Sequence, residues 1–246
     1  MNPARDVVLS LTLPEGAEDL QAVRAAWQGL VAKNEQLLRD TRAILLLEVH
    51  PDASAAALAS EIALAGHDVP VHRLSSSSWG RCFNDALLFA VSCDRARFWV
   101  HLDDEHVCTR PFWNSARAVL RGPGAHLWQL QLTDDWRDLP AERLVAHDGF
   151  TEVLPHPDAQ TKEWLDPKRY RDAEPYLSRW PVFSLRPAAH ALEHFRSSRG
   201  LLMRPFDEEA DWAPLQWQFG LRLEQLGARK GVLDPPAFES GDAMAE

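Results

Sequence analysis

The chain has 246 residues, of which 46% are apolar and 25% are charged. These values lie close to the globular average, so they exclude a wholly disordered chain, and the length suits one large α/β domain. Acidic residues outnumber basic ones by 36 to 26, which gives a formal net charge of −10. This charge excludes the overall positive field of most nucleic-acid binders, although a local basic groove is compatible with it.

The cysteines and the apolar runs predict a cytoplasmic protein with reduced thiols. Runs such as residues 43–47 are far too short to span a bilayer, and residues 1–16 lack the apolar segment and cleavage site of a signal peptide. Cys82, Cys93 and Cys108 are odd in number and lack the spacing of a zinc site.

Strands and helices are expected to alternate through the first half of the chain. Short apolar or alternating runs predict strands at 6–13, 42–49, 69–74, 97–102 and 126–132. Apolar stripes predict helices between them, at 20–31, 58–65 and 83–91, and from an N-cap at Thr109 to about Leu120. This order predicts a mostly parallel, doubly wound α/β sheet with right-handed crossovers.

The second half is expected to be less regular. Residues 133–179 are rich in Asp, Pro and Trp and have weak periodicity, as binding loops often do. Helices are expected at 187–195 and 211–226, and the tail after Pro235 is expected to be loose.

Residues that follow or end the predicted strands are expected along one edge of the sheet, where α/β folds bind ligands at the carboxyl ends of their strands. These residues are Pro14, Glu48, the serines at 75–78 and the acids at 103–105. The acids belong to the string WVHLDDEH at 99–106. Side chains alternate along a strand, so Asp103 and Glu105 are expected on one side and can hold a divalent cation. The alternative is an ordinary polar strand end.

The helix and strand before these acids, GRCFNDALLFAVSCDRARFWVHLDDE, resemble a signature of GT-A glycosyltransferases. The resemblance is to the large inverting family that includes cellulose and chitin synthases. Gly80, Asn84 and the Leu-Asp-Asp-Glu run at 102–105 match, with a Gly-to-Asn spacing one residue shorter and Glu as the third acid. The resemblance implies a single GT-A (Rossmann-like) domain: a mostly parallel sheet flanked by helices, with an irregular acceptor-side segment. Its halves would be nucleotide-sugar-binding (1–132) and acceptor-side (133–235), followed by a loose tail (236–246).

The resemblance also implies a metal-dependent site for a nucleotide-sugar donor, with a UDP-sugar expected from the family. Asp103 and Glu105 would contact Mg²⁺ or Mn²⁺ and the donor diphosphate, and Asp104 would lie near the ribose or sugar. Arg81 and Asn84 would lie beside the diphosphate or sugar. The alternatives are a solvated helix residue at Arg81 and a loop-bridging or capping role for Asn84.

Three further residues are expected to border this site. Glu48 would lie near the nucleobase and ribose, or carry only a strand-end charge. Trp180 resembles an acceptor-side residue that would stack on a sugar, with a core aromatic as the alternative. Arg186 would reach the diphosphate or cap the sheet edge.

An inverting transfer needs a general base that deprotonates the acceptor hydroxyl. In the family this base follows a Glu and precedes an aromatic residue and a helix, and Asp211 occupies the corresponding place before Trp212. Ala210 stands where the family has Glu, so Glu208 and Glu209 are alternative bases. Asp211 also suits a helix N-cap.

A histidine pair offers a second possible metal site. His190 and His194 would share a face of the predicted helix at 187–195 and could bind zinc, although such pairs are more often structural. The family often adds a late His ligand to its metal, but no His follows His194.

The sequence therefore predicts a metal-dependent glycosyltransferase that moves one sugar, with inversion, to a glycan, a small molecule or a modified nucleobase. A non-catalytic GT-A-like nucleotide-binding protein is one alternative. A nucleotidyltransferase is another, although no glycine-rich phosphate loop follows the first predicted strand.

Overall fold

The computed structural model describes residues 5–13, 20–49, 60, 69–122, 124–133, 143–154, 183–197 and 205–240. Several predictions fall outside this part of the chain. They concern Pro14, Trp180, most of the helix at 58–65 and much of the irregular segment at 133–179.

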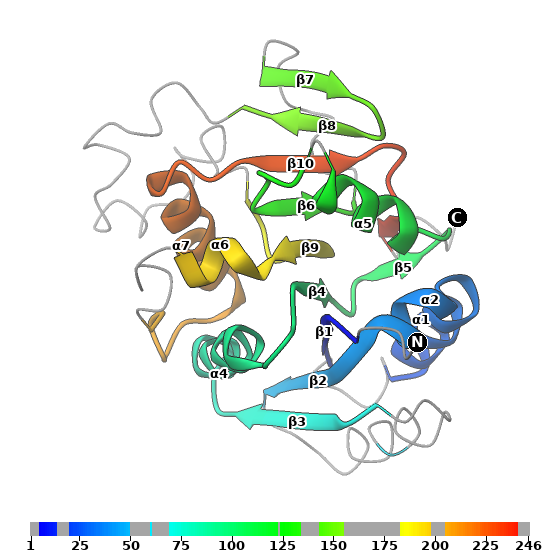
Figure 1. Ribbon diagram of the computed structural model, residues 1–246. Helices are drawn as coiled ribbons and strands as arrows, with labels where there is room; N and C mark the ends of the chain where they lie inside the picture. Colours follow the sequence, from blue (N-terminus) through cyan, green and yellow to red (C-terminus); the bar gives the residue numbers. More distant parts are fainter. Residues whose placement is uncertain are drawn as a thin grey trace.

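Nine strands of the described residues form one sheet, in the order β3-β2-β1-β4-β9-β6-β10-β8-β7 (Figure 1). Their bounds are β1 Val7–Thr12, β2 Thr41–Val49, β3 Val71–Ser76, β4 Phe98–Leu102, β6 Gln129–Gln131, β7 Leu144–His147, β8 Phe150–Val153, β9 Ala188–Ala191 and β10 Lys230–Leu233. Strands β3, β2, β1 and β4 are parallel to one another. Strand β9 is antiparallel to β4 and β6, and β6 is parallel to β10. The predicted mostly parallel sheet is therefore confirmed.

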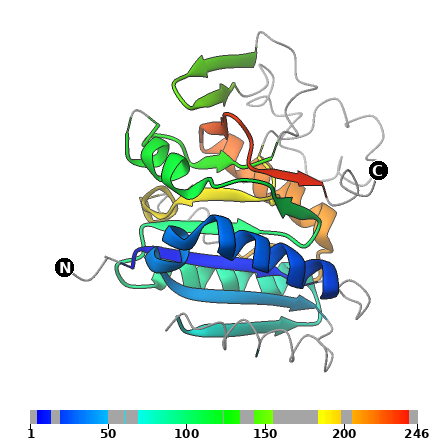
Figure 2. The ribbon, with the colours of Figure 1, turned by 90° about the vertical axis from the view of Figure 1, so that its right-hand side faces the viewer.

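Helices cover both faces of the sheet (Figures 1 and 2). Their bounds are α1 Leu20–Lys33, α2 Glu35–Asp40, α4 Trp79–Ser92, α5 Trp113–Arg121, α6 Leu192–Ser197 and α7 Trp212–Gln225. Alternation along β1 sends Leu9 into the core beneath α1, α2 and α5, and Val8 into the core beneath α4, α6 and α7. The central strands are apolar on both faces for this reason.

The structure corrects the predicted helix at 187–195. Residues Ala188–Ala191 form β9, and only Leu192–Ser197 form a helix, α6. The alanines of β9 favour a helix locally, but the strand pairs with both β4 and β6 and is fully buried, so tertiary pairing overrides the propensity.

Other short strands were missed by the sequence analysis. The hairpin β7–β8 lies in the segment predicted to be irregular, and β10 follows α7. Residues Phe238–Ser240, predicted to be part of a loose tail, form β11 and pair with β5, His106–Cys108. Each of these strands has three or four residues, too few for alternation to distinguish them from loops.

The predicted N-cap Thr109 is also wrong. Helix α5 begins after Phe112, and Asn34 caps it from the α1–α2 junction: its Oδ1 accepts hydrogen bonds from the backbone N–H of Phe112 (2.8 Å) and Trp113 (3.2 Å). The Thr109 hydroxyl instead donates to the carbonyl of Ala237 at 3.2 Å. The cap comes from a distant part of the chain, so local sequence does not reveal it.

The position of His190 on β9 makes stability depend on pH. Its imidazole is fully buried, stacks on Trp99 with ring centroids 5.0 Å apart, and has a pKa lowered by burial to about 3. In the unfolded chain the His190 imidazole binds a proton below about pH 6.5, whereas in the native state it stays neutral until much lower pH. The free energy of unfolding that this residue contributes above about pH 6.5 is therefore lost as the pH falls. We expect the free energy of unfolding to drop by about 2 kcal/mol between pH 7 and pH 5 through this residue.

Chemical denaturation of His190→Phe at both pH values measures this contribution, because the variant should lose about 2 kcal/mol of the pH dependence. The exposed His72 provides the control, since His72→Phe should keep the wild-type dependence. Equal pH dependence in His190→Phe and wild type would contradict the assignment.

Candidate active site

The acids after β4 lie at the carboxyl edge of the parallel strands. All five residues of β4 are buried, and the chain turns immediately after Leu102. Asp103 is buried at this turn, Asp104 is half-buried and Glu105 is exposed. The strand therefore positions one carboxylate within the protein and presents another to solvent.

Asp103, Glu105 and His106 form a cluster in which one potential ligand atom from each residue lies within 4.8 Å of the others. The predicted pair of carboxylates is thus together, and His106 is an addition that the sequence analysis missed. The imidazole Nδ1 lies 2.9 and 3.0 Å from the two Asp103 oxygens, and the His106 backbone N–H donates to Oδ1 at 3.1 Å. The only signal for His106 was its place directly after Glu105.

This donor set fits a divalent cation. Two carboxylates provide the oxygen ligands that Mg²⁺ and Mn²⁺ prefer. The imidazole nitrogen of His106 favours Mn²⁺ of these two ions, because Mg²⁺ is held almost entirely by oxygen. The turn into β5 places these side chains together, and β5 in turn pairs with β11, where His106 lies opposite Ser240.

Asp104 turns toward β1 instead. The Thr12 hydroxyl at the end of β1 donates to Asp104 Oδ1 at 2.9 Å. Burial raises the pKa of the Asp104 carboxyl above its usual value, and the hydrogen bond from Thr12 partly offsets this rise. Asp104 is therefore separated from Asp103 and Glu105 as predicted, but the turn after Leu102 separates them, because the three acids do not belong to the strand.

Glu48 lies on the same edge of the sheet, as predicted, but its carboxylate is already engaged. Arg73 donates to both of its oxygens at 2.7 Å, and the Ser75 hydroxyl donates to Oε2 at 3.0 Å. The side chain of Glu48 is almost fully buried. These contacts favour the alternative of a strand-end charge over a direct contact with a nucleobase.

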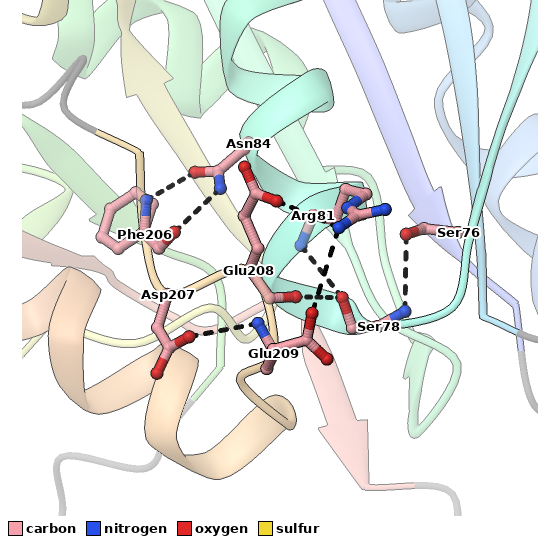
Figure 3. A network of polar contacts seen from close by, with 8 residues as sticks. All are labelled: Ser76, Ser78, Arg81, Asn84, Phe206, Asp207, Glu208 and Glu209. Carbon is pink, nitrogen blue, oxygen red and sulfur yellow. Dashed lines mark hydrogen bonds and ion pairs between the residues drawn. The ribbon is translucent and has the colours of Figure 1, made fainter.

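Arg81 and Asn84 lie on α4 and face the segment that precedes α7 (Figure 3). Arg81 Nη2 donates to Glu208 Oε2 at 3.0 Å in an exposed ion pair. The amide of Asn84 makes two hydrogen bonds with the backbone of Phe206, which favours the predicted loop-bridging alternative. Glu209, the second alternative base, has an exposed side chain (84%).

Asp211 immediately precedes α7, as predicted, but its side chain makes no capping hydrogen bond with the helix. The next residue places this helix start near β4: the Trp212 ring contacts the ring of the buried His101, with centroids 6.0 Å apart, and packs edge-on against Trp79 at 5.1 Å. His101 is two residues before Asp103. The start of α7 and the cluster of Asp103, Glu105 and His106 therefore lie at the same edge of the sheet.

Arg186 is half-buried just before β9, and Trp180 lies outside the described residues. The shared helix face on which His190 and His194 could have bound zinc does not form, because His190 is on β9 and His194 is on α6, where it stacks on Trp128. Among the residues that the structure describes, the cluster at Asp103 is the only group of three or more potential metal ligands.

No helix among the described residues is long and apolar enough to cross a bilayer.

The parallel half-sheet, with acidic residues at its carboxyl edge, has the Rossmann-like architecture of the GT-A glycosyltransferase fold. GalNAc-T7, solved with UDP, GalNAc and Mn²⁺, matches 92% of this chain and 42% of its own with a TM-score of 0.56 and 12% identity. TarS from S. aureus (1-349) matches 95% of this chain and 59% of its own with a TM-score of 0.54 and 14% identity.

This chain thus spans less than two thirds of either solved structure, and at such low identity the likeness concerns the fold alone. No protein-family profile and no curated protein matches the sequence.

Proposed function

We propose that this protein is a metal-dependent glycosyltransferase that moves one sugar from a nucleotide-sugar, with inversion, to an acceptor hydroxyl. The observation that carries the proposal is the cluster of Asp103, Glu105 and His106 at the carboxyl edge of a GT-A sheet. A UDP-sugar is the proposed donor, in line with the family resemblance and with the UDP and Mn²⁺ held by GalNAc-T7.

The proposed donor site consists of the cluster and Asp104. A bound Mn²⁺ or Mg²⁺ would neutralise the diphosphate and stabilise it as a leaving group. Asp104 lies toward β1, where it can accept a hydrogen bond from a ribose or sugar hydroxyl. Arg186 is retained as a further candidate for the diphosphate, and Trp180 as a candidate stacking surface for the acceptor.

Asp211 is the proposed general base. It would take the proton of the acceptor hydroxyl as that oxygen attacks the anomeric carbon and the bond to the diphosphate breaks. Of the three candidate carboxylates, those of Glu208 and Glu209 both lie within ion-pair distance of Arg81 Nη2, at 3.0 and 3.9 Å. Asp211 lies beside Trp212, which packs on His101 near the end of β4.

Nucleotide binding tests the proposed donor site directly. UDP with Mn²⁺ should raise the melting temperature by about 5 °C at one hundred times its Kd, because the ligand binds the native state. GDP, CDP and dTDP are the matched ligands, and each nucleotide is also measured with EDTA. The absence of a metal-dependent shift with all four nucleotides would contradict the proposed function.

A further inference from the structure

The first turns of α4 hold the segment at 205–211, here called the docked segment, which leads into α7 (Figure 3). Asn84 Nδ2 donates to the carbonyl of Phe206 at 3.1 Å, and its Oδ1 accepts from the backbone N–H of Phe206 at 2.7 Å. Both polar atoms of one side chain thus bind the backbone of one residue. This pairing fixes the position and the direction of the docked segment at Phe206.

Gly80 provides a second attachment, one helical turn before Asn84 and on the same face of α4. Its backbone N–H donates to the carbonyl of Ala210 at 3.0 Å. A Cβ atom at Gly80 would lie 1.9 Å from the carbonyl oxygen of Asp207, so a glycine is required where the two backbones cross. The Ser78 hydroxyl also donates to the carbonyl of Glu208.

The side chain of Phe206 anchors the docked segment from the other direction. Its ring is buried between Phe83 of α4 and Phe219 of α7, with centroids 5.5 and 6.3 Å away. The Arg222 guanidinium lies over the ring at 3.9 Å. The docked segment is therefore bound to α4 through its backbone, and to both α4 and α7 through the side chain of Phe206.

The geometry points to Gly80 and Asn84 as positioning residues that hold the docked segment and so place Asp211 at the end of β4. This inference rests on the proposed function, because it assigns Asp211 as the base. A base displaced by about 1 Å can lower the rate about 100-fold, even when the substrates still bind. The glycine and asparagine of the sequence signature then act on turnover through the docked segment and make no contact with the donor.

Two variants release the docked segment by different routes. Asn84→Ala removes both hydrogen bonds to Phe206, and Gly80→Ala displaces the segment sterically while improving the helix propensity of α4. Asp85→Ala is the matched control, because Asp85 is exposed on the same helix. Circular dichroism verifies that each variant is folded.

Digestion by the glutamate-specific endoprotease Glu-C measures the release without any activity assay. Cleavage after Glu208 and Glu209 should be about tenfold faster in Asn84→Ala and Gly80→Ala than in wild type, because contacts that oppose local opening are lost. Asp85→Ala should be cleaved at the wild-type rate. Equal cleavage rates in all four proteins would overturn the inference.

Kinetics distinguish positioning from donor binding. With Mn²⁺ and a panel of UDP-hexoses and UDP-N-acetylhexosamines, kcat for UDP release should fall about 100-fold in both variants, with the donor KM and the UDP affinity unchanged. A rise in donor KM with unchanged kcat would overturn the inference in favour of a donor contact. A wild-type protein that neither binds UDP nor releases it from any donor would overturn the proposed function, and the positioning role with it.

Discussion

Asp103→Ala is expected to lower metal-dependent UDP release about 1000-fold. The Asp103 carboxylate is a candidate metal ligand, and it also forms hydrogen bonds with the backbone N–H and the imidazole Nδ1 of His106. Its removal therefore deletes one candidate ligand and leaves the second, His106, without the contacts that hold it in place. Metal ions contribute several kcal/mol to the stabilisation of a leaving diphosphate. A loss of about 4 kcal/mol of this stabilisation corresponds to the expected decrease in rate of about 1000-fold. The measurements are UDP release and Mn²⁺ binding by electron paramagnetic resonance.

Two further variants test whether the effect of Asp103→Ala belongs to the proposed metal site. His106→Ala should weaken Mn²⁺ binding by an intermediate factor, about tenfold to 100-fold, because one ligand is lost while both carboxylates remain. Asp94→Ala removes an exposed acid from the loop after α4 and should change neither measurement. If Asp103→Ala binds Mn²⁺ and releases UDP as wild type does, the metal site lies elsewhere.

The parallel strands could be predicted because each carries its own signal. β1, β2 and β4 are long enough to show apolar residues that must face two helical layers, and each ends at a recognisable break. β9 shows the limit of this approach. Its sequence Ala-Ala-His-Ala favours a helix, and only the pairing with β4 and β6 makes it a strand.

The candidate site likewise contains residues that local sequence could place and residues whose position depends on distant parts of the chain. Asp103 and Glu105 could be placed at the edge of the sheet because they directly follow a buried strand, although they lie in the turn after β4 and do not continue its alternation. His106 joins them because the chain reverses into β5, whose partner β11 is some 130 residues later in the sequence. The role of Asn84 likewise depends on Phe206, 122 residues away, so the sequence alone left two roles open.

Ala210 stands where the family that the sequence resembles has Glu, and this difference has a structural reason. Its side chain is buried in the core beneath α4 and α7, and its carbonyl accepts the hydrogen bond from Gly80. A glutamate at this position would place a charge among apolar side chains at a cost of several kcal/mol, or push the docked segment away from α4. The missing Glu therefore suits the way this chain holds the docked segment, and it leaves Asp211 as the carboxylate next to Trp212.

Asp211→Asn should lower sugar transfer by about 1000-fold while UDP and Mn²⁺ bind as in wild type. The amide keeps the size of the side chain but cannot take the acceptor proton, and general-base catalysis is worth about 100-fold to 10,000-fold. Stability should change little, because the Asp211 side chain makes no capping hydrogen bond. UDP release and nucleotide affinity, measured on the same samples, separate loss of the base from loss of the donor site.

Glu208→Gln and Glu209→Gln decide between the three carboxylates. Glu208 forms an exposed ion pair with Arg81, and such pairs contribute at most about 1 kcal/mol, so its variant should keep a rate within about fivefold of wild type. Glu209→Gln should behave in the same way, because its side chain is exposed and its ion pair with Arg81 is long, at 3.9 Å. A near wild-type rate in Asp211→Asn, together with a large loss in either glutamate variant, would move the base to that glutamate and contradict the role given to Asp211.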